Sequence, residues 1–210
     1  MTDASGPTPE ASLQRLRDGN ARFVLGAHDR AHLGWNPGIA DGQRPFAAVL
    51  GCSDSRAPAE LVFDQGLGSL FVVRVAGNVV APSGIGSIEF TVGLGTRLVV
   101  VMGHSQCGAV AATVQALEQG EDPESKNLRS ITDRIRPHIE GVVRLAQERH
   151  IERWVLLREA VRANIRASAD QLRHGSTILE AACSTGRVLV VGAEYELETG
   201  RVDFFDLPPR

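Results

Sequence analysis

Four short, Val-rich apolar runs alternate with helix-length segments along this chain, and this alternation is the feature that most constrains the fold. The runs are Phe46–Leu50, Leu70–Val75, Leu98–Met102 and Arg187–Val191. Continuous hydrophobicity of this kind is typical of strands that are covered on both faces, as in a parallel sheet. We therefore expect an α/β fold in which a central, mainly parallel β-sheet is flanked by helices.

The segments around these runs have the length and the apolar spacing of helices. An N-terminal helical arm is expected over Ala11–Gly26, followed by a loop over Ala27–Arg44. At the other end, Ala193–Phe205 is predicted to form a C-terminal β-hairpin. The remaining predicted helices are Ala57–Gln65, Ile85–Leu94, Gly108–Glu118, Ser125–His150 and Glu152–His174.

Length and composition indicate one globular domain over residues 1–210, with residues 1–10 expected to be flexible. Of the 210 residues, 43% are hydrophobic and 22% are charged, as in ordinary globular proteins. A formal net charge of −3 gives no electrostatic attraction for nucleic acid or an anionic membrane. No apolar run approaches the roughly 20 residues that span a bilayer, and the N-terminus lacks the features of a signal peptide. We expect a cytoplasmic protein that acts on a small molecule, without nucleic acid or membrane partners.

Metal-binding side chains follow two of the predicted strands. Cys52 comes just after the first apolar run and His104 just after the third, and ligands of such sheets bind beyond the carboxyl ends of the strands. Cys107 lies three residues after His104, in a turn that opens a helix, so both side chains can point at one ion. Two thiolates and one imidazole suit zinc in tetrahedral geometry. Because the chain has only three cysteines and no export signal, metal ligation is a better interpretation than disulfides.

The fourth position of such a zinc site decides whether it is structural or catalytic. Structural sites are closed by four protein ligands, whereas the cysteine and histidine set here stops at three. Asp54 is the remaining candidate, but Arg56 lies two residues further and can take the carboxylate in a bidentate pair. A water molecule would then complete the site, and zinc would convert it to zinc-bound hydroxide near neutral pH. Two thiolates donate much charge to the metal, so the water bound to it should be less acidic than at a zinc held by neutral histidines. We therefore expect activity to rise with pH above neutrality.

Several ordered motifs together resemble those of the beta-class carbonic anhydrases, over about residues 10–205. The motifs are Cys52-Ser53-Asp54-Ser55-Arg56, Phe71-Val72-Val73-Arg74, Ala76-Gly77-Asn78, Ser87-Ile88-Glu89-Phe90 and Gly103-His104-Ser105-Gln106-Cys107-Gly108-Ala109. The resemblance implies reversible hydration of carbon dioxide to bicarbonate and a proton. It also implies one Zn²⁺ per chain and an α/β fold that assembles as a homodimer or homotetramer.

The resemblance assigns roles to the residues of the predicted metal site. It implies that Cys52, His104 and Cys107 are the three constant zinc ligands, and that Asp54 and Arg56 form the catalytic dyad. Asp54 has two states in such enzymes. Paired with Arg56 it leaves the site open, and bound to zinc it would close the site as a fourth ligand.

The resemblance also indicates substrate-binding residues. Gln43 is similar to an amide that orients the substrate, while Phe71 and Phe90 are similar to apolar pocket residues that the partner subunit contributes. Val49 stands where the bicarbonate-inhibited subgroup carries Trp, so we expect that regulatory anion site to be absent. Arg74 ends an apolar strand, and we assign it to interface ion pairing rather than to the substrate side.

Other interpretations of the same residues stay open. Zinc hydroxide could attack carbonyl sulfide or carbon disulfide, or Asp54 could permanently close a non-catalytic zinc site. Cys52 and Cys107 could also act as a redox-sensing dithiol, because ligand thiolates are oxidisable. Cys183 has no ligand-type neighbour in the sequence and is interpreted as a packed free thiol.

Overall fold

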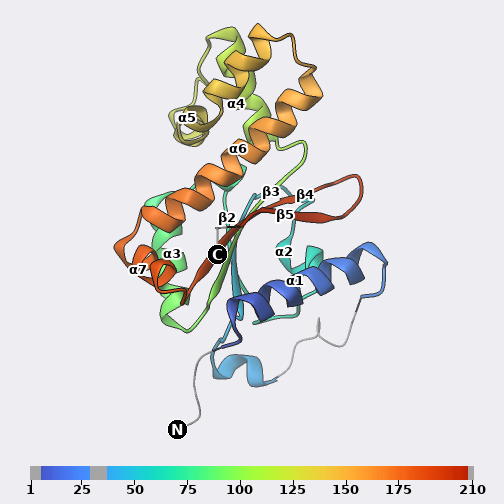
Figure 1. Cartoon of the computed structure of the whole chain (residues 1–210), viewed down its shortest axis with the longest axis vertical. Coiled ribbons are helices and arrows are strands. Elements are labelled where there is room, and N and C mark those ends of the chain that lie inside the picture. The colour runs from blue at the N-terminus through green and yellow to red at the C-terminus, as the bar shows by residue number, and fades with distance from the viewer. Residues whose placement is uncertain (1–5, 29–36, 208–210) are drawn as a thin grey trace.

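The computed structural model describes residues 6–28 and 37–207, and Figure 1 shows how its helices and strands are arranged. In chain order the elements are α1 (Pro9–Val24), the 3₁₀ turn η2 (Pro37–Asp41), β1 (Ala47–Gly51), α2 (Ala59–Val62), β2 (Leu70–Arg74), the 3₁₀ turn η3 (Ala76–Asn78), α3 (Pro82–Gly93), β3 (Leu98–His104), α4 (Gly108–Gln119), α5 (Lys126–Glu148), α6 (Arg153–His174), α7 (Thr177–Ser184), β4 (Leu189–Tyr195) and β5 (Val202–Asp206). Residues 1–5 of the expected flexible segment lie outside the described residues.

The strands form one five-stranded sheet in the order β2-β1-β3-β4-β5. The first four strands are parallel, and β5 pairs antiparallel with β4, so the mainly parallel sheet and the C-terminal hairpin are confirmed. β1 and β3 are buried along their whole length. The expectation that all four apolar runs are covered on both faces is wrong for β2, which forms the edge of the sheet and is only partly buried.

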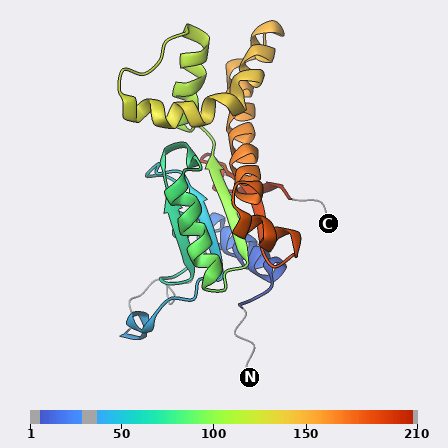
Figure 2. The same cartoon turned by 90° about the vertical axis from the view of Figure 1, so that its left-hand side faces the viewer.

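Helices cover both faces of the sheet. Because successive strand residues point to opposite faces, Leu50 and Val101 pack in a cluster with α3, α4, α5, α6 and α7. Val49 and Val100 pack on the other face with α1 and α2. In Figures 1 and 2, α4, α5 and the N-terminal half of α6 extend beyond the sheet as a helical group. The carboxyl ends of β1 and β3 meet this group.

Several element boundaries differ from the sequence predictions, and α1 begins at Pro9, within the segment that was expected to be flexible. The run Arg187–Val191 and the first arm of the predicted hairpin are one continuous strand, β4. The predicted helix Ala57–Gln65 is shortened to α2, because Pro58 precedes its first residue and Asp64 has a positive φ of 48°. The predicted loop over Ala27–Arg44 contains η2, and its residues 29–36 lie outside the described residues.

Helix α7 was missed by sequence reasoning, although it has a recognisable start. The side chain of Ser176 accepts a hydrogen bond from the backbone N–H of Leu179 at 3.2 Å, which is the usual arrangement of an N-cap. Helix α1 begins in a similar way, with the Thr8 side chain accepting from Ala11 N–H and Pro9 in the first turn.

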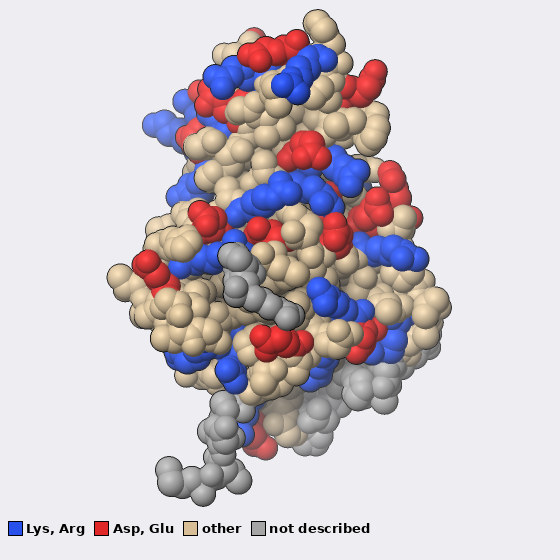
Figure 3. All heavy atoms as spheres, in the orientation of Figure 1, with Lys and Arg blue, Asp and Glu red and all other residues tan. Residues whose placement is uncertain are grey.

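Charged side chains of both signs are interspersed over the face of the molecule in Figure 3. Within residues 6–28 and 37–207, no helix combines the length and the hydrophobicity that crossing a membrane requires.

Candidate metal centre

The sheet brings the three predicted metal ligands together. Cys52 directly follows β1, and His104 is the last residue of the neighbouring parallel strand β3. Cys107 is the N-cap residue of α4, which begins at the next residue, Gly108. All three side chains are buried, and their donor atoms lie within 4.8 Å of one another. The structure therefore places these residues in one cluster, as the sequence predicted.

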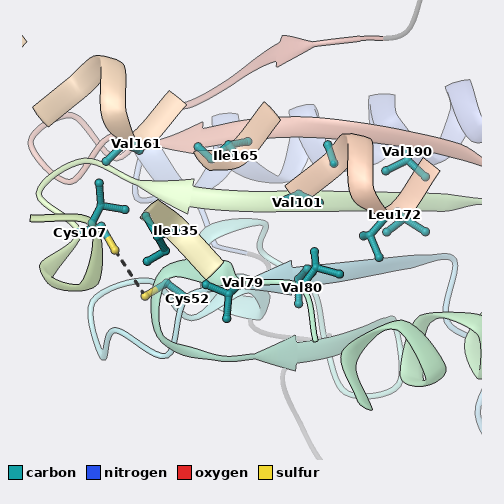
Figure 4. Packing of buried hydrophobic residues seen from close by; sticks show 14 of the residues in the cluster. Cys52, Val79, Val80, Val101, Cys107, Ile135, Val161, Ile165, Leu172 and Val190 are labelled. Carbon is teal, nitrogen blue, oxygen red and sulfur yellow. Dashed lines mark hydrogen bonds between the residues drawn. The ribbon is translucent and has the colours of Figure 1, made fainter. Parts of the chain in front are cut away.

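The geometry of this cluster fits a zinc ion. Cys52 Sγ and Cys107 Sγ are 4.0 Å apart (Figure 4). Zinc–sulfur bonds of about 2.3 Å at a tetrahedral angle would separate two sulfurs by about 3.8 Å. Nδ1 of His104 is 2.9 Å from the carbonyl oxygen of Ser105, to which it can donate. Nε2 of His104 is buried and has no hydrogen-bond partner within the described part of the chain, as expected for a nitrogen that binds a metal.

The electrostatics of the cluster favour a cation. A hydrogen bond from Cys107 lowers the pKa of the Cys52 thiol to about 4, against the opposing effect of burial. The same hydrogen bond, together with burial, raises the pKa of the Cys107 thiol. Burial acts to lower the pKa of His104, but the Cys52 thiolate outweighs burial and the pKa is raised. The contact with Cys107 therefore favours the thiolate form of Cys52, which attracts positive charge into a buried site.

Asp54 and Arg56 form a bidentate ion pair beside the cluster. Nε and Nη2 of Arg56 donate to Oδ1 and Oδ2 of Asp54 at 3.0 and 2.8 Å, and the Arg56 backbone N–H donates to Oδ1 at 2.9 Å. These hydrogen bonds hold the pKa of the Asp54 carboxyl well below its usual range. Oδ2 of Asp54 is 3.8 Å from Nε2 of His104, so the ionised carboxylate lies at the border of the donor cluster.

Arg74 is a site residue that sequence reasoning placed elsewhere. Its Nε donates to the carbonyl oxygen of Cys52 at 3.0 Å, and its Nη2 donates to that of Asp54 at 2.6 Å. Arg74 therefore holds the backbone of the segment that carries the ligand and the dyad. Both acceptors are backbone atoms, so no residue type in the sequence indicates these contacts. The one available signal was that Arg74 ends the strand next to β1.

The structure does not bring the three predicted substrate-binding residues to Cys52 within one chain. Phe71 pairs with Ala48, near the start of β1, whereas Cys52 follows the end of that strand. The ring of Phe90 lies 6.2 Å from that of Phe71, and 57% of Phe90 is exposed. Gln43 is exposed and precedes β1. Their assignment to the substrate site stays a prediction that requires a second copy of the chain.

Comparison with solved structures defines the class of protein. A β-carbonic anhydrase of the fungal pathogen Aspergillus fumigatus superposes with a TM-score of 0.70 and 26% identity, over 96% of this chain and 92% of that one. The β-carbonic anhydrase CcaA superposes with a TM-score of 0.67 and 27% identity, over 95% and 94% of the two chains. The fold is thus that of the β-class carbonic anhydrases.

Sequence comparison leads to the same family. The profile of the carbonic anhydrase family matches residues 47–202. A carbonic anhydrase of Mycolicibacterium smegmatis is 40% identical over 93% of this chain and 92% of its own length. Carbonic anhydrase 2 of Mycobacterium tuberculosis is 36% identical over 92% and 91%. The chain belongs to the carbonic anhydrase family of enzymes.

Proposed function

We propose that this enzyme catalyses the reversible hydration of carbon dioxide to bicarbonate and a proton, with one Zn²⁺ held by Cys52, His104 and Cys107. The observation that carries the proposal is the buried Cys-His-Cys donor set, which lies beside an ionised Asp54. The relatives named carbonic anhydrase support it, because they match nearly the whole chain.

The residues around the donor set have separate tasks in this reaction. When bound, zinc supplies a Lewis acid that makes hydroxide available from water near neutral pH. The Ser105 carbonyl orients the His104 ring, so that Nε2 lies with the two cysteine sulfurs. The Asp54 carboxylate can only accept hydrogen bonds. We infer that it accepts one from the reacting oxygen and so orients that oxygen toward carbon dioxide.

The pairing of Asp54 with Arg56 favours a catalytic site over a closed structural one. Both carboxylate oxygens are engaged by the guanidinium group, so Asp54 would have to give up these bonds to become a fourth zinc ligand. The Arg56 side chain is 51% exposed, which gives this side of the cluster contact with solvent. These contacts support an open resting site.

We further infer that the working enzyme is a homodimer or homotetramer, in which Phe71 and Phe90 of one subunit complete the substrate pocket of another and Gln43 orients the substrate. The partly buried edge strand β2 and the exposed Phe90 leave an apolar surface for such a contact. A similar structure from Sordaria macrospora is described as a tetrameric β-carbonic anhydrase. The cytoplasmic location stays a prediction from the sequence.

Stopped-flow measurement of carbon dioxide hydration across about pH 6.5–9, with zinc content determined on the same sample, tests the proposal. We expect about one zinc per chain and a rate that climbs with pH, and we expect both to be lost in Cys107→Ser. Carbonyl sulfide and carbon disulfide assayed on the same sample would reveal a different preferred substrate. Zinc binding without hydration at any pH would contradict the proposed reaction.

A further inference from the structure

A buried amide on helix α6 is linked to the metal centre through the turn η3. Asn164 is only 1% exposed, and its Nδ2 donates to the carbonyl oxygen of Gly77 at 2.8 Å. The backbone N–H of the same Gly77 donates to Cys52 Sγ at 3.3 Å. A continuous chain of two hydrogen bonds therefore links α6 to a zinc-ligand sulfur.

We propose that Asn164 is a positioning residue that tunes the Cys52 thiolate through Gly77. The inference rests on the proposed zinc site, and it adds a residue that neither touches the metal donors nor lies in any of the motifs singled out in the sequence. Asn164 fixes the Gly77 carbonyl and so restrains the backbone of this residue, whose N–H, in the preceding peptide group, donates to the sulfur.

Gly77 needs this support because its conformation and its surroundings are restrictive. It adopts a left-handed φ of 69° within the short turn η3, where the turn has no side-chain cap. A Cβ at this position would lie 2.8 Å from Ile135 Cδ1 and 3.1 Å from Ala109 Cβ, so a larger residue would add close contacts with α4 and α5 to the strain of the positive φ. Figure 4 shows Ile135 close to both cysteines. The Gly77 carbonyl is thereby buried, and Asn164 supplies its donor.

The residue next to Asn164 contacts the second ligand-bearing segment. A Cβ on Gly103 would lie 2.6 Å from Ile165 Cδ1, so Ile165 packs directly on the backbone that precedes His104. Adjacent residues of α6 thus contact the turn whose N–H donates to Cys52 and the strand that carries His104. A shift of α6 at this point would disturb the surroundings of both metal ligands.

Hydrogen bonds to a thiolate withdraw charge from its sulfur. Besides the contact with Cys107, Cys52 Sγ accepts hydrogen bonds from two backbone N–H groups of the described residues, those of Asp54 at 3.4 Å and Gly77 at 3.3 Å. Without Asn164, the Gly77 N–H would be less well aimed, and the sulfur would donate more charge to zinc. A weaker Lewis acid requires a higher pH for the same activity. Outer-shell partners of metal ligands typically contribute about 10–100-fold in metal affinity or activity.

The test compares Asn164→Leu, which removes the donor at similar size, with Thr96→Val as a matched control. Thr96 Oγ1 likewise donates to a buried backbone carbonyl, that of Pro45 at 3.0 Å, but it precedes β3 and so lies at the opposite end of the sheet from His104. Asn164→Ser, whose hydroxyl is too short to reach Gly77, replaces Asn164→Leu if the latter does not fold.

Three measurements are made on each purified protein. They are the zinc dissociation constant by chelator competition, the thiolate-to-metal charge-transfer band of the cobalt-substituted protein, and the pH at which hydration is half-maximal. We expect the Asn164 variants to bind zinc about 10-fold more weakly or worse, with a shifted cobalt band and a higher half-maximal pH. Thr96→Val should leave the cobalt band and the half-maximal pH unchanged.

Failure of the inference is distinguishable from failure of the proposed function. Suppose that the wild type binds zinc and is active, but the Asn164 variants have an unchanged cobalt band and zinc affinity. This result would overturn the inference and leave the proposed function intact. Equal changes in Thr96→Val would also overturn it, because they would reflect general destabilisation. If the wild type bound no zinc, the proposed function would fall. Hydrogen exchange of the Gly77 amide would then decide the inference: loss of protection in the Asn164 variants alone supports it, and no loss overturns it.

Discussion

The position of a single carboxylate, that of Asp54, determines what the metal centre can do. Its side chain is 18% exposed and is held by three hydrogen bonds from Arg56, one of them from the backbone. Burial would favour a protonated carboxyl, yet these bonds outweigh it and keep the pKa low. Asp54 is therefore an anion throughout the neutral range, and it is available as a hydrogen-bond acceptor.

Replacing Asp54 by Asn should reduce carbon dioxide hydration by about 100-fold, the usual contribution of a positioned acid–base group. An amide can donate as well as accept, so it no longer fixes the direction of the hydrogen bond. Zinc content should stay near one per chain, because Cys52, His104 and Cys107 are unchanged. Asp18→Asn, at an exposed carboxylate on α1, is the control and should retain full activity. Normal turnover by Asp54→Asn would show that the carboxylate has no part in the reaction.

A pH effect on stability is expected from His138 on α5, far along the chain from the ligands. Burial lowers the pKa of His138 below its usual value of 6.5. Between the lowered pKa and the unfolded value, the unfolded chain binds more protons than the folded one, so folding stability rises with pH and falls as the medium becomes acidic. In urea unfolding at pH 7.5 and about pH 5.5, His138→Gln should lose less stability on acidification than the wild type. Equal losses would argue against a partly buried imidazole that stays neutral.

At the scale of elements, one asparagine attaches α1 to the rest of the molecule. Asn20 is buried, and its Nδ2 donates to the carbonyl oxygens of Val62 and Gly200 at 3.1 and 2.9 Å. Its Oδ1 accepts from Val202 N–H at 2.9 Å. A single side chain thus joins α1 to the end of α2 and to the β4–β5 hairpin.

Asn20→Leu should lower the free energy of unfolding by about 2–4 kcal/mol, because three backbone groups lose their partner at once. Each such group costs about 1–3 kcal/mol when it is left buried and unsatisfied, and water that reaches some of them reduces the total. Urea unfolding followed by circular dichroism measures this change. Gln14→Leu, on the same helix but in an exposed pair with Asp18, should change stability by less than about 0.5 kcal/mol. A loss of similar size in both variants would mean that Asn20 is not a specific anchor.

The sequence predicted the central strands, the long helices and the metal cluster, because each has a local signal. Val-rich runs indicate buried strands, and the ends of parallel strands converge, so Cys52 and His104 could be placed together without a structure. Arg74 and Asn164 could not be predicted, since both act on backbone atoms of segments distant in the chain. The edge position of β2 was missed for a related reason, because its residues are as apolar as those of β1 and only pairing distinguishes them.

At the scale of the whole molecule, the apolar surface of β2 and α3 indicates how subunits associate. Within the described part of the chain, β2 has a neighbour on one side only, and its outer edge leaves backbone hydrogen-bonding groups for another chain. Phe90 lies next to this edge through its contact with Phe71. Association through this surface would bury the exposed ring and bring the predicted pocket residues toward a partner's metal centre.

Phe90→Arg should weaken the self-association of the protein at least about 10-fold, since a charge would replace a central aromatic contact. Light scattering after size-exclusion chromatography over a dilution series measures the effect. Leu128→Arg, which changes a comparably exposed apolar residue on α5 (56% against 57%), is the control. An unchanged mass profile for Phe90→Arg would place the interface elsewhere.

The two cysteine sulfurs lie 4.0 Å apart although 55 positions of sequence separate them. Closing a flexible loop of that length costs about 3.5 kcal/mol of chain entropy, in addition to a constant term. Here the parallel sheet meets that cost, because β1 and β3 are hydrogen-bonded neighbours irrespective of any ion. The fold therefore positions the ligands before a metal ion binds, and the ion does not have to order the chain. In this respect the protein is the opposite of a zinc finger, whose fold exists only while the metal is bound.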